Sequence, residues 1–156
     1  MAELETLARN FKGDLLTPSD DGYEKAIARW ALNASRRARV VAFVKDAEDV
    51  SFAIKYAIAQ KLPIAIRGGG HSSSAVSSVE DGLVIDLSRY LNIAEVDPTQ
   101  KFAKIGGGAT WETVDNATIK HGLASVAGTV NDVTMKFNIP HASLFLTFTQ
   151  DRSWRV

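Results

Sequence analysis

The chain has 156 residues, of which 46% are hydrophobic and 23% charged, which predicts one domain of ordinary globular composition. Its 18 basic and 18 acidic side chains cancel, so the charge balance indicates neither a nucleic-acid partner nor an anionic membrane surface. Because the chain contains no cysteine, disulfides and thiolate metal sites are excluded.

The first residues lack the basic start and apolar run of a secretory signal. No stretch approaches the roughly 18 apolar residues of a membrane span. We therefore expect a soluble, cytoplasmic protein without a membrane partner.

Helical turns are predicted in the first 30 residues. Leu4, Leu7 and Phe11 recur at helical spacing, which indicates a short amphipathic helix over residues 2–11. Residues 17–22 are rich in turn formers, and a further helical turn or two is expected before Trp30.

A strand–helix–strand unit follows. Val40–Val44 is a short apolar run typical of a buried strand, and Asp46 is placed to cap a helix over about residues 47–60. The apolar residues of that helix at helical spacing are Val50, Ile54, Ala57 and Ile58. After Pro63, the run Ile64–Ile66 is predicted as another buried strand, which gives a parallel pair joined by a right-handed crossover.

A glycine loop directly follows the second strand of this unit. In open sheets, ligands bind beyond the carboxyl ends of parallel strands, which is where Arg67–Ser72 stands. Gly68, Gly69 and Gly70 let main-chain N–H groups approach a ligand closely and form a concavity that suits a pyrophosphate. His71 stands immediately beyond that concavity, and Ser72 is placed to donate a hydrogen bond to phosphate.

The second half of the chain is predicted to be mixed. Leu83–Leu87 is a third strand, and residues 93–96 and 102–105 form a hairpin with a loop of four or five residues. Thr110 is placed to cap a helix through Lys120.

Gly122 is placed to end that helix. Residues 123–130 are small and apolar, which suits a strand or a close backbone contact, and residues 143–149 form an uncharged β-prone run. The expected fold class is α+β.

Several other candidates favour structural roles. The run Gly106–Gly108 lacks the third glycine of a dinucleotide fingerprint and is explained by turn geometry and helix packing. His121 suits a helix C-terminus, and His141 has no role that the sequence assigns. The histidines show no ligand-like spacing, so no metal site is expected.

Residues from about 34 to 131 resemble the FAD-binding domain of the vanillyl-alcohol-oxidase and p-cresol-methylhydroxylase (PCMH) superfamily, and within it the berberine-bridge-enzyme-like FAD-linked oxidases. Order and spacing both fit. The segments that carry the resemblance are Arg37–Val41, the helix after Asp46, Pro63–Ser72, Gly82–Ser88, Gly106–Trp111 and His121–Val130.

The resemblance implies FAD bound with its pyrophosphate against Arg67–Ser72, and a covalent bond from His71 to the flavin 8α-methyl group. Gly128 and Thr129 would approach the pyrophosphate or ribityl chain. Arg67 would neutralise phosphate charge or pair with a carboxylate while holding the loop. A second link through cysteine, which some members have, is impossible because Leu123 stands in that neighbourhood.

The resemblance also implies hydride transfer from a small organic substrate to flavin N5, with dioxygen as a common electron acceptor. It divides the chain into a helical extension (1–33), a partial FAD-binding domain (34–131) and a divergent tail (132–156). The family's substrate domain is not recognisable here. An inactive, truncated flavin-binding module and a Rossmann-like nicotinamide domain are the alternatives.

Overall fold

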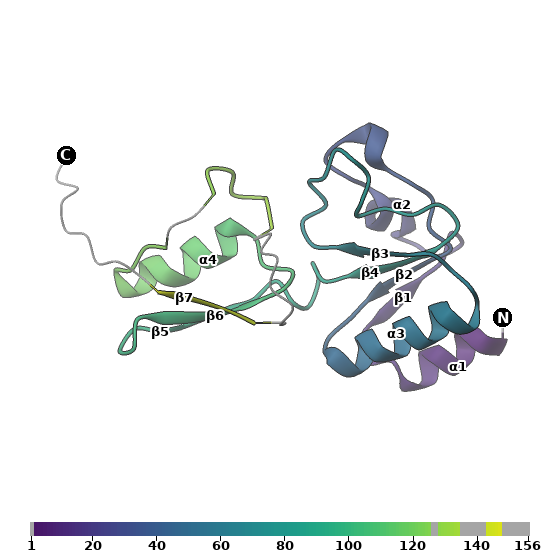
Figure 1. Cartoon of the computed structure of the whole chain (residues 1–156), viewed down its shortest axis with the longest axis horizontal. Coiled ribbons are helices and arrows are strands. Elements are labelled where there is room, and N and C mark those ends of the chain that lie inside the picture. The colour runs from purple at the N-terminus through teal and green to yellow at the C-terminus, as the bar shows by residue number, and fades with distance from the viewer. Residues whose placement is uncertain (1, 126–127, 135–142, 148–156) are drawn as a thin grey trace.

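The computed structural model describes residues 2–125, 128–134 and 143–147, which form two lobes, each built on a sheet (Figure 1). The first lobe contains α1 (Ala2–Asn10), β1 (Asp14–Leu16), α2 (Tyr23–Ile27), η1 (Leu32–Ala34), β2 (Val40–Phe43), α3 (Ala47–Ala59), β3 (Ile64–Arg67) and β4 (Leu83–Asp86). The second contains β5 (Ala94–Asp97), β6 (Phe102–Gly106), α4 (Trp111–Thr118), η2 (Ile119–His121) and β7 (Ser143–Thr147). The α+β expectation is confirmed.

The strands of the first sheet lie in the order β1-β2-β4-β3. β4 runs parallel to both β2 and β3, and β1 pairs antiparallel with β2. The predicted strand–helix–strand unit therefore forms, but the prediction that its two strands pair is wrong. The third predicted strand, β4, lies between them. All four residues of β4 are buried, whereas only one residue of β3 is, and a strand buried on both faces is typical of the interior of a parallel sheet.

Both faces of the first sheet are covered, by α2 on one side and by α1 and α3 on the other (Figure 1). Alternate residues of β2 explain this, because Val41 and Phe43 pack toward α2, whereas Val40 and Ala42 pack toward α3. The sheet is thus the centre of a three-layer lobe, and the carboxyl ends of β2, β3 and β4 point the same way.

Helix α3 begins as the sequence predicts, but its buried stripe is different. The Asp46 carboxylate accepts hydrogen bonds from the N–H groups of Glu48 and Asp49, which confirms the cap. Asp49 is fully buried, because its carboxylate accepts hydrogen bonds from the N–H groups of Lys12, Gly13 and Lys45. Ala53 and Ala57 are also fully buried, because small side chains allow the helix to approach the sheet closely. In consequence Ile54 and Ile58, which we assigned to the apolar face, are 38% and 69% exposed.

Strand β3 is an edge strand, which corrects the expectation that it is buried. Only Ala65 is buried, whereas Ile64 and Ile66 are 40% and 61% exposed. The cause is the topology, since β4 occupies the interior position and leaves one side of β3 unpaired among the described strands.

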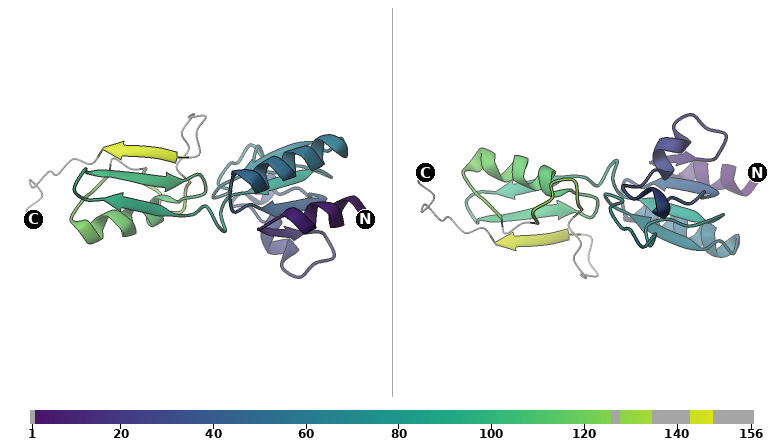
Figure 2. Two further views of the ribbon diagram at one scale, coloured as in Figure 1. Left: turned by 90° about the horizontal axis from the view of Figure 1, so that it is seen from below. Right: turned by 90° about the horizontal axis from the view of Figure 1, so that it is seen from above.

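The second lobe confirms the predicted hairpin, cap and helix end. β5 and β6 pair antiparallel, and in both views of Figure 2 this hairpin lies between α4 and β7. The Thr110 hydroxyl accepts from the N–H of Thr113 at the start of α4, and Gly122 adopts φ +64° after η2. The β-prone run at the end of the chain forms β7, which pairs antiparallel with β6.

Within the described part of the chain, none of the helices has the length and apolar character required to cross a membrane.

Candidate functional site

The glycine loop lies where the sequence predicts, at the carboxyl end of β3 (Ile64–Arg67). Gly68 and Gly69 are partly exposed and Gly70 is buried. Gly70 adopts φ +75°, a left-handed conformation that favours glycine, and its carbonyl accepts a hydrogen bond from the N–H of Trp30. The loop is therefore a fixed bend on the surface, not a loose connection.

Arg67 holds the start of this loop through a buried ion pair. Its Nη1 donates to Oδ2 of Asp86 at 2.7 Å and to the carbonyl of Ala26 at 3.2 Å. Asp86 is fully buried, and its other carboxylate oxygen accepts from the N–H and hydroxyl of Ser88. Pairing with a carboxylate was one of the two roles that the sequence left open for Arg67, and contact with a cofactor stays a prediction.

A second buried arginine, Arg29, is a residue that the sequence analysis missed. Its guanidinium donates to the carbonyls of Ala26, Ala28 and Ser77, which ties the loop after His71 to α2. Burial, and then the nearby positive charge of Arg67, lowers the Arg29 pKa to about 10. A lone arginine in a polar segment carries no pattern that would predict its burial.

His71 is held from two sides. Its Nε2 lies 2.8 Å from Oδ2 of Asp132, and its ring stacks on the indole of Trp30 with centroids 5.2 Å apart and planes at 19°. Trp30 is 68% exposed, which is unusual for so large an apolar ring. Neither contact can be inferred from the sequence, because both partners are distant from His71 along the chain.

Residues 131–134 pack between the glycine loop and the start of α4. The carbonyls of Asn131 and Val133 accept from the N–H groups of Glu112 and Trp111, and the Thr134 hydroxyl accepts from the N–H of Gly69. A Cβ at Gly68 would lie 2.7 Å from the Thr134 side chain. Glycine is therefore required here to admit the neighbouring segment as well as any ligand.

The main-chain N–H groups that remain available fit a diphosphate. Among the described residues, no acceptor is found for the N–H groups of Gly68, Gly70, His71 and Ser72. The Ser72 hydroxyl bonds to that of Ser74, at an exposed position. Clustered N–H donors at a glycine bend are the donor set that an anionic phosphate requires.

The other residues that we linked to the cofactor lie farther along the chain. Gly128 packs against Trp111, since a Cβ there would lie 2.6 Å from the indole nitrogen, and Thr129 is exposed. The expected close backbone contact in residues 123–130 is thus found at Gly128. Leu123 is buried in the core of the second lobe.

The second glycine run has a structural role, as we expected, but its cause is a close approach of two backbone segments. A Cβ at Gly106 or Gly108 would clash with the carbonyl oxygen of Leu91 or Leu87. His121 is exposed in η2, and His141 lies outside the described residues. Across residues 2–125, 128–134 and 143–147, no group of three or more potential metal ligands is found.

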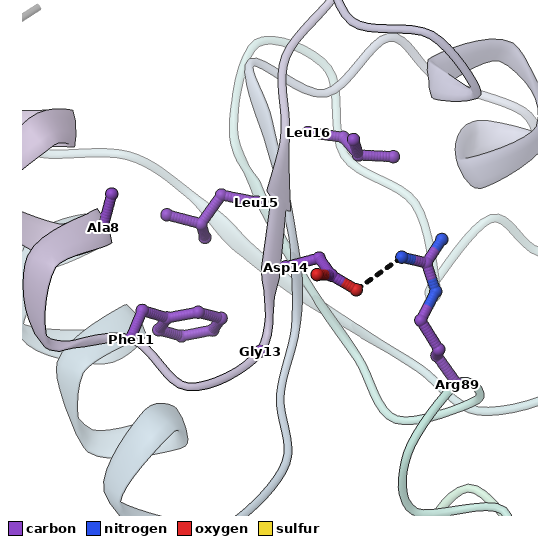
Figure 3. A pocket seen from close by; sticks show the side chains of 7 residues that line it. All are labelled: Ala8, Phe11, Gly13, Asp14, Leu15, Leu16 and Arg89. Atoms are coloured by element: carbon purple, nitrogen blue, oxygen red, sulfur yellow. Dashed lines mark hydrogen bonds and ion pairs between the residues drawn. The ribbon is translucent and has the colours of Figure 1, made fainter.

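A surface hollow of about 410 Å³ lies elsewhere, between α1 and β1 (Figure 3). Leu15 faces Ala8 of α1, whereas Asp14 faces Arg89 across the strand, with its Oδ2 2.6 Å from Arg89 Nη1. None of the predicted site residues lines this hollow. The candidate site is therefore the open glycine loop, not this hollow.

Asp14, which lines this hollow, makes the stability of the fold depend on pH. Hydrogen bonds from the Tyr90 hydroxyl and the Arg89 guanidinium lower the pKa of the Asp14 carboxyl. A lowered folded-state pKa stabilises the fold above the unfolded value of about 4, and that contribution is lost as pH falls through the folded value. We expect Asp14→Asn to be less stable than the wild type at pH 7, with the difference shrinking as the pH falls below about 4.

Urea denaturation at a series of pH values measures this difference. Asp21→Asn, at an exposed carboxylate of the turn before α2, is the matched control and should show no such trend. A difference for Asp14→Asn that stays constant across the pH series contradicts the assignment.

A sequence model of the family described as FAD binding domain matches residues 38–136. Among curated proteins, (R)-6-hydroxynicotine oxidase of Paenarthrobacter nicotinovorans is 30% identical over 119 residues, which cover 76% of this chain and 26% of that protein. The FAD-linked oxidoreductase hasG of Aspergillus fumigatus is 33% identical over 136 residues, which cover 81% of this chain and 29% of that protein. The chain thus spans less than a third of the length of these curated relatives.

Solved structures show the same likeness. The 6-hydroxy-D-nicotine oxidase of Arthrobacter nicotinovorans superposes with a TM-score of 0.76 at 30% identity, over 80% of this chain and 27% of that one. The carbohydrate oxidase of Microdochium nivale shares the fold, with a TM-score of 0.75 at 18% identity over 86% of this chain and 29% of that one.

These findings confirm the resemblance to FAD-linked oxidases and do not favour a Rossmann-like nicotinamide domain. The relatives are named as FAD-linked oxidoreductases and oxidases, and the matched residues include the whole glycine loop. By sequence and by fold, this chain belongs to the FAD binding domain family, and its cofactor is FAD.

Proposed function

We propose that the glycine loop binds the diphosphate of FAD through the N–H groups of Gly68 and of residues 70–72, and that His71 is bonded covalently to the flavin. Gly128 and Thr129 complete the contacts along the ribityl and diphosphate part of the cofactor. In the longer protein that the relatives represent, this unit serves oxidation of a small organic substrate, an alcohol, a sugar or an alkaloid-like amine.

One observation carries the proposal. A bend lies at the carboxyl end of a parallel strand, and the N–H groups of Gly68 and residues 70–72 have no acceptor in the part of the chain that the structure describes. His71 stands at the far end of this bend. The side chains of Arg29, which is buried, and Arg67, which is partly buried, lie against the bend, and a Cβ at Gly70 would lie 3.0 Å from Arg67 Nε. Two arginines beside one carboxylate, Asp86, leave a positive charge below the loop, which favours an anionic group.

When bound, FAD supplies the acceptor for a hydride at its N5 atom and passes the electrons to dioxygen. The residues of this chain hold the cofactor and its attachment point in place. The bend fixes the diphosphate, the Trp30 ring fixes the plane of His71, and the Arg67–Asp86 pair fixes the strand end that precedes both.

A second candidate is a flavin-binding module that turns nothing over. The contact from Thr134 to the Gly69 N–H favours it, because that contact engages one of the amides otherwise free to hold FAD. Candidate substrates can be added to the flavin-loaded chain without oxygen. Bleaching of the flavin would identify an oxidase, and a flavin that stays yellow would identify the inert module.

The purified chain, reconstituted with FAD and then precipitated with acid, tests binding and attachment together. We expect yellow colour in the pellet. Colour in the supernatant would indicate reversible FAD, and a chain that cannot take up FAD would contradict the proposal.

Gly70→Ala should weaken reversible FAD binding by about tenfold, because a Cβ strains a left-handed residue by roughly 1–2 kcal/mol. Gly122→Ala is the matched control, since Gly122 has φ +64° and nothing within 4 Å of its Cβ position. The dissociation constant can be measured by quenching of flavin fluorescence. Equal effects of the two substitutions would contradict a role for the glycine loop.

A further inference from the structure

The contact between His71 and Asp132 distinguishes the two nitrogens of the imidazole ring. Nε2 lies 2.8 Å from the Asp132 carboxylate, whereas no partner of Nδ1 is found among the described residues. A neutral imidazole carries one proton, and the hydrogen bond at one nitrogen determines which nitrogen bears it. A carboxylate at Nε2 keeps the proton there and leaves the lone pair on Nδ1.

Asp132 is itself fixed in place, although its side chain is 66% exposed. The flanking carbonyls of Asn131 and Val133 accept hydrogen bonds from the first N–H groups of α4. The Trp30 ring restricts the imidazole plane from the other side. The imidazole thus contacts the Asp132 carboxylate through Nε2 and the Trp30 indole through its ring face.

We propose that Asp132 is the positioning residue for covalent attachment of FAD, holding His71 so that Nδ1 is the atom that bonds to the flavin. The inference rests on the proposed function. It assigns a role to Asp132, for which the sequence indicated none.

The bond forms between Nδ1 and the 8α carbon of the flavin. The 8α methyl group gives up one hydrogen and the imidazole gives up its Nε2 proton, so the flavin gains two electrons and two protons. Dioxygen then takes these, becomes hydrogen peroxide and restores the oxidised flavin. Attack by Nδ1 makes the imidazole transiently cationic, and the Asp132 carboxylate stabilises that charge and accepts its proton for release to solvent.

The test compares full-chain variants prepared without flavin and then incubated with FAD in air-saturated buffer. Flavin that remains on the protein after denaturation measures attachment, and fluorescence quenching measures reversible affinity. We expect Asp132→Asn to slow attachment about tenfold or more, as is typical when the hydrogen-bond partner that orients a functional histidine is lost. Its reversible affinity should stay within about twofold of the wild type, since Asp132 does not belong to the diphosphate cradle.

Asp132→Glu should recover most of the rate, and the surface variant Asp21→Asn should match the wild type. In the flavin-free chain, the nitrogen NMR spectrum of His71 should show the proton of the neutral ring on Nε2 in the wild type. This last measurement does not require bound FAD.

The inference is overturned if Asp132→Asn attaches flavin as fast as the wild type. It is also overturned if the variant attaches flavin faster, because Asp132 would then hinder the bond between His71 and the flavin. A wild type that binds FAD reversibly but never covalently also overturns it and leaves FAD binding intact. Failure of the wild type to bind FAD, with the Nε2 proton present, contradicts the proposed function instead.

Discussion

Replacing Asp86 with alanine is expected to lower the free energy of unfolding by about 3–5 kcal/mol, the cost of removing one partner of a buried ion pair. The Asp86 side chain is fully buried and that of Arg67 is only 17% exposed, so neither charge is hydrated in compensation. The loss is a large share of the roughly 5–15 kcal/mol that stabilises a typical domain. Urea denaturation followed by circular dichroism measures it.

The pair of Arg39 and Asp81 supplies a matched control. Those groups are 2.7 Å apart, as are Arg67 and Asp86, but their side chains are 50% and 70% exposed. Asp81→Ala should therefore cost less than about 1 kcal/mol. Equal losses in the free energy of unfolding for Asp81→Ala and Asp86→Ala would show that burial does not determine how much the Arg67–Asp86 pair contributes to stability.

His71→Ala is expected to abolish covalent flavin while leaving a fraction of reversibly bound FAD. The histidine supplies the only attacking nitrogen at the glycine bend among the described residues, whereas the N–H groups of the bend belong to the main chain and survive the substitution. Denaturing electrophoresis with detection of flavin fluorescence measures attachment. A fluorescent band in the variant would mean that another residue is the tether.

His121→Ala controls for loss of a histidine as such. His121 is exposed in η2, in the other lobe, and no ring contact is found for it among the described residues. Its substitution should leave both attachment and affinity at the wild-type level.

Local signals were sufficient wherever neighbouring residues decide the structure. Asp46 and Thr110 cap the helices that they were predicted to cap, and Gly122 ends its helix in the expected left-handed conformation. Each of these depends on hydrogen bonds within a few residues, so a single sequence contains the information. The glycine bend was located by the same reasoning.

Contacts between distant segments could not be predicted in the same way. Nothing near Ile66 indicates that another strand takes the interior position and leaves it exposed. The burial of Arg29 depends on carbonyls of the loop after His71, and the partner of His71 is Asp132, in a segment that the sequence analysis set aside as divergent. Such pairings are properties of the tertiary fold.

The position of β4 has a consequence for how the chain acquires its shape during synthesis. β3 has β4 as its one neighbour in the described sheet, yet β4 leaves the ribosome after it. The end of β3 therefore gains its neighbouring strand, and Arg67 its carboxylate partner, only after β4 has been synthesised. Substitutions that weaken β4 should delay cofactor capture in a refolding experiment even where the finished protein binds FAD normally.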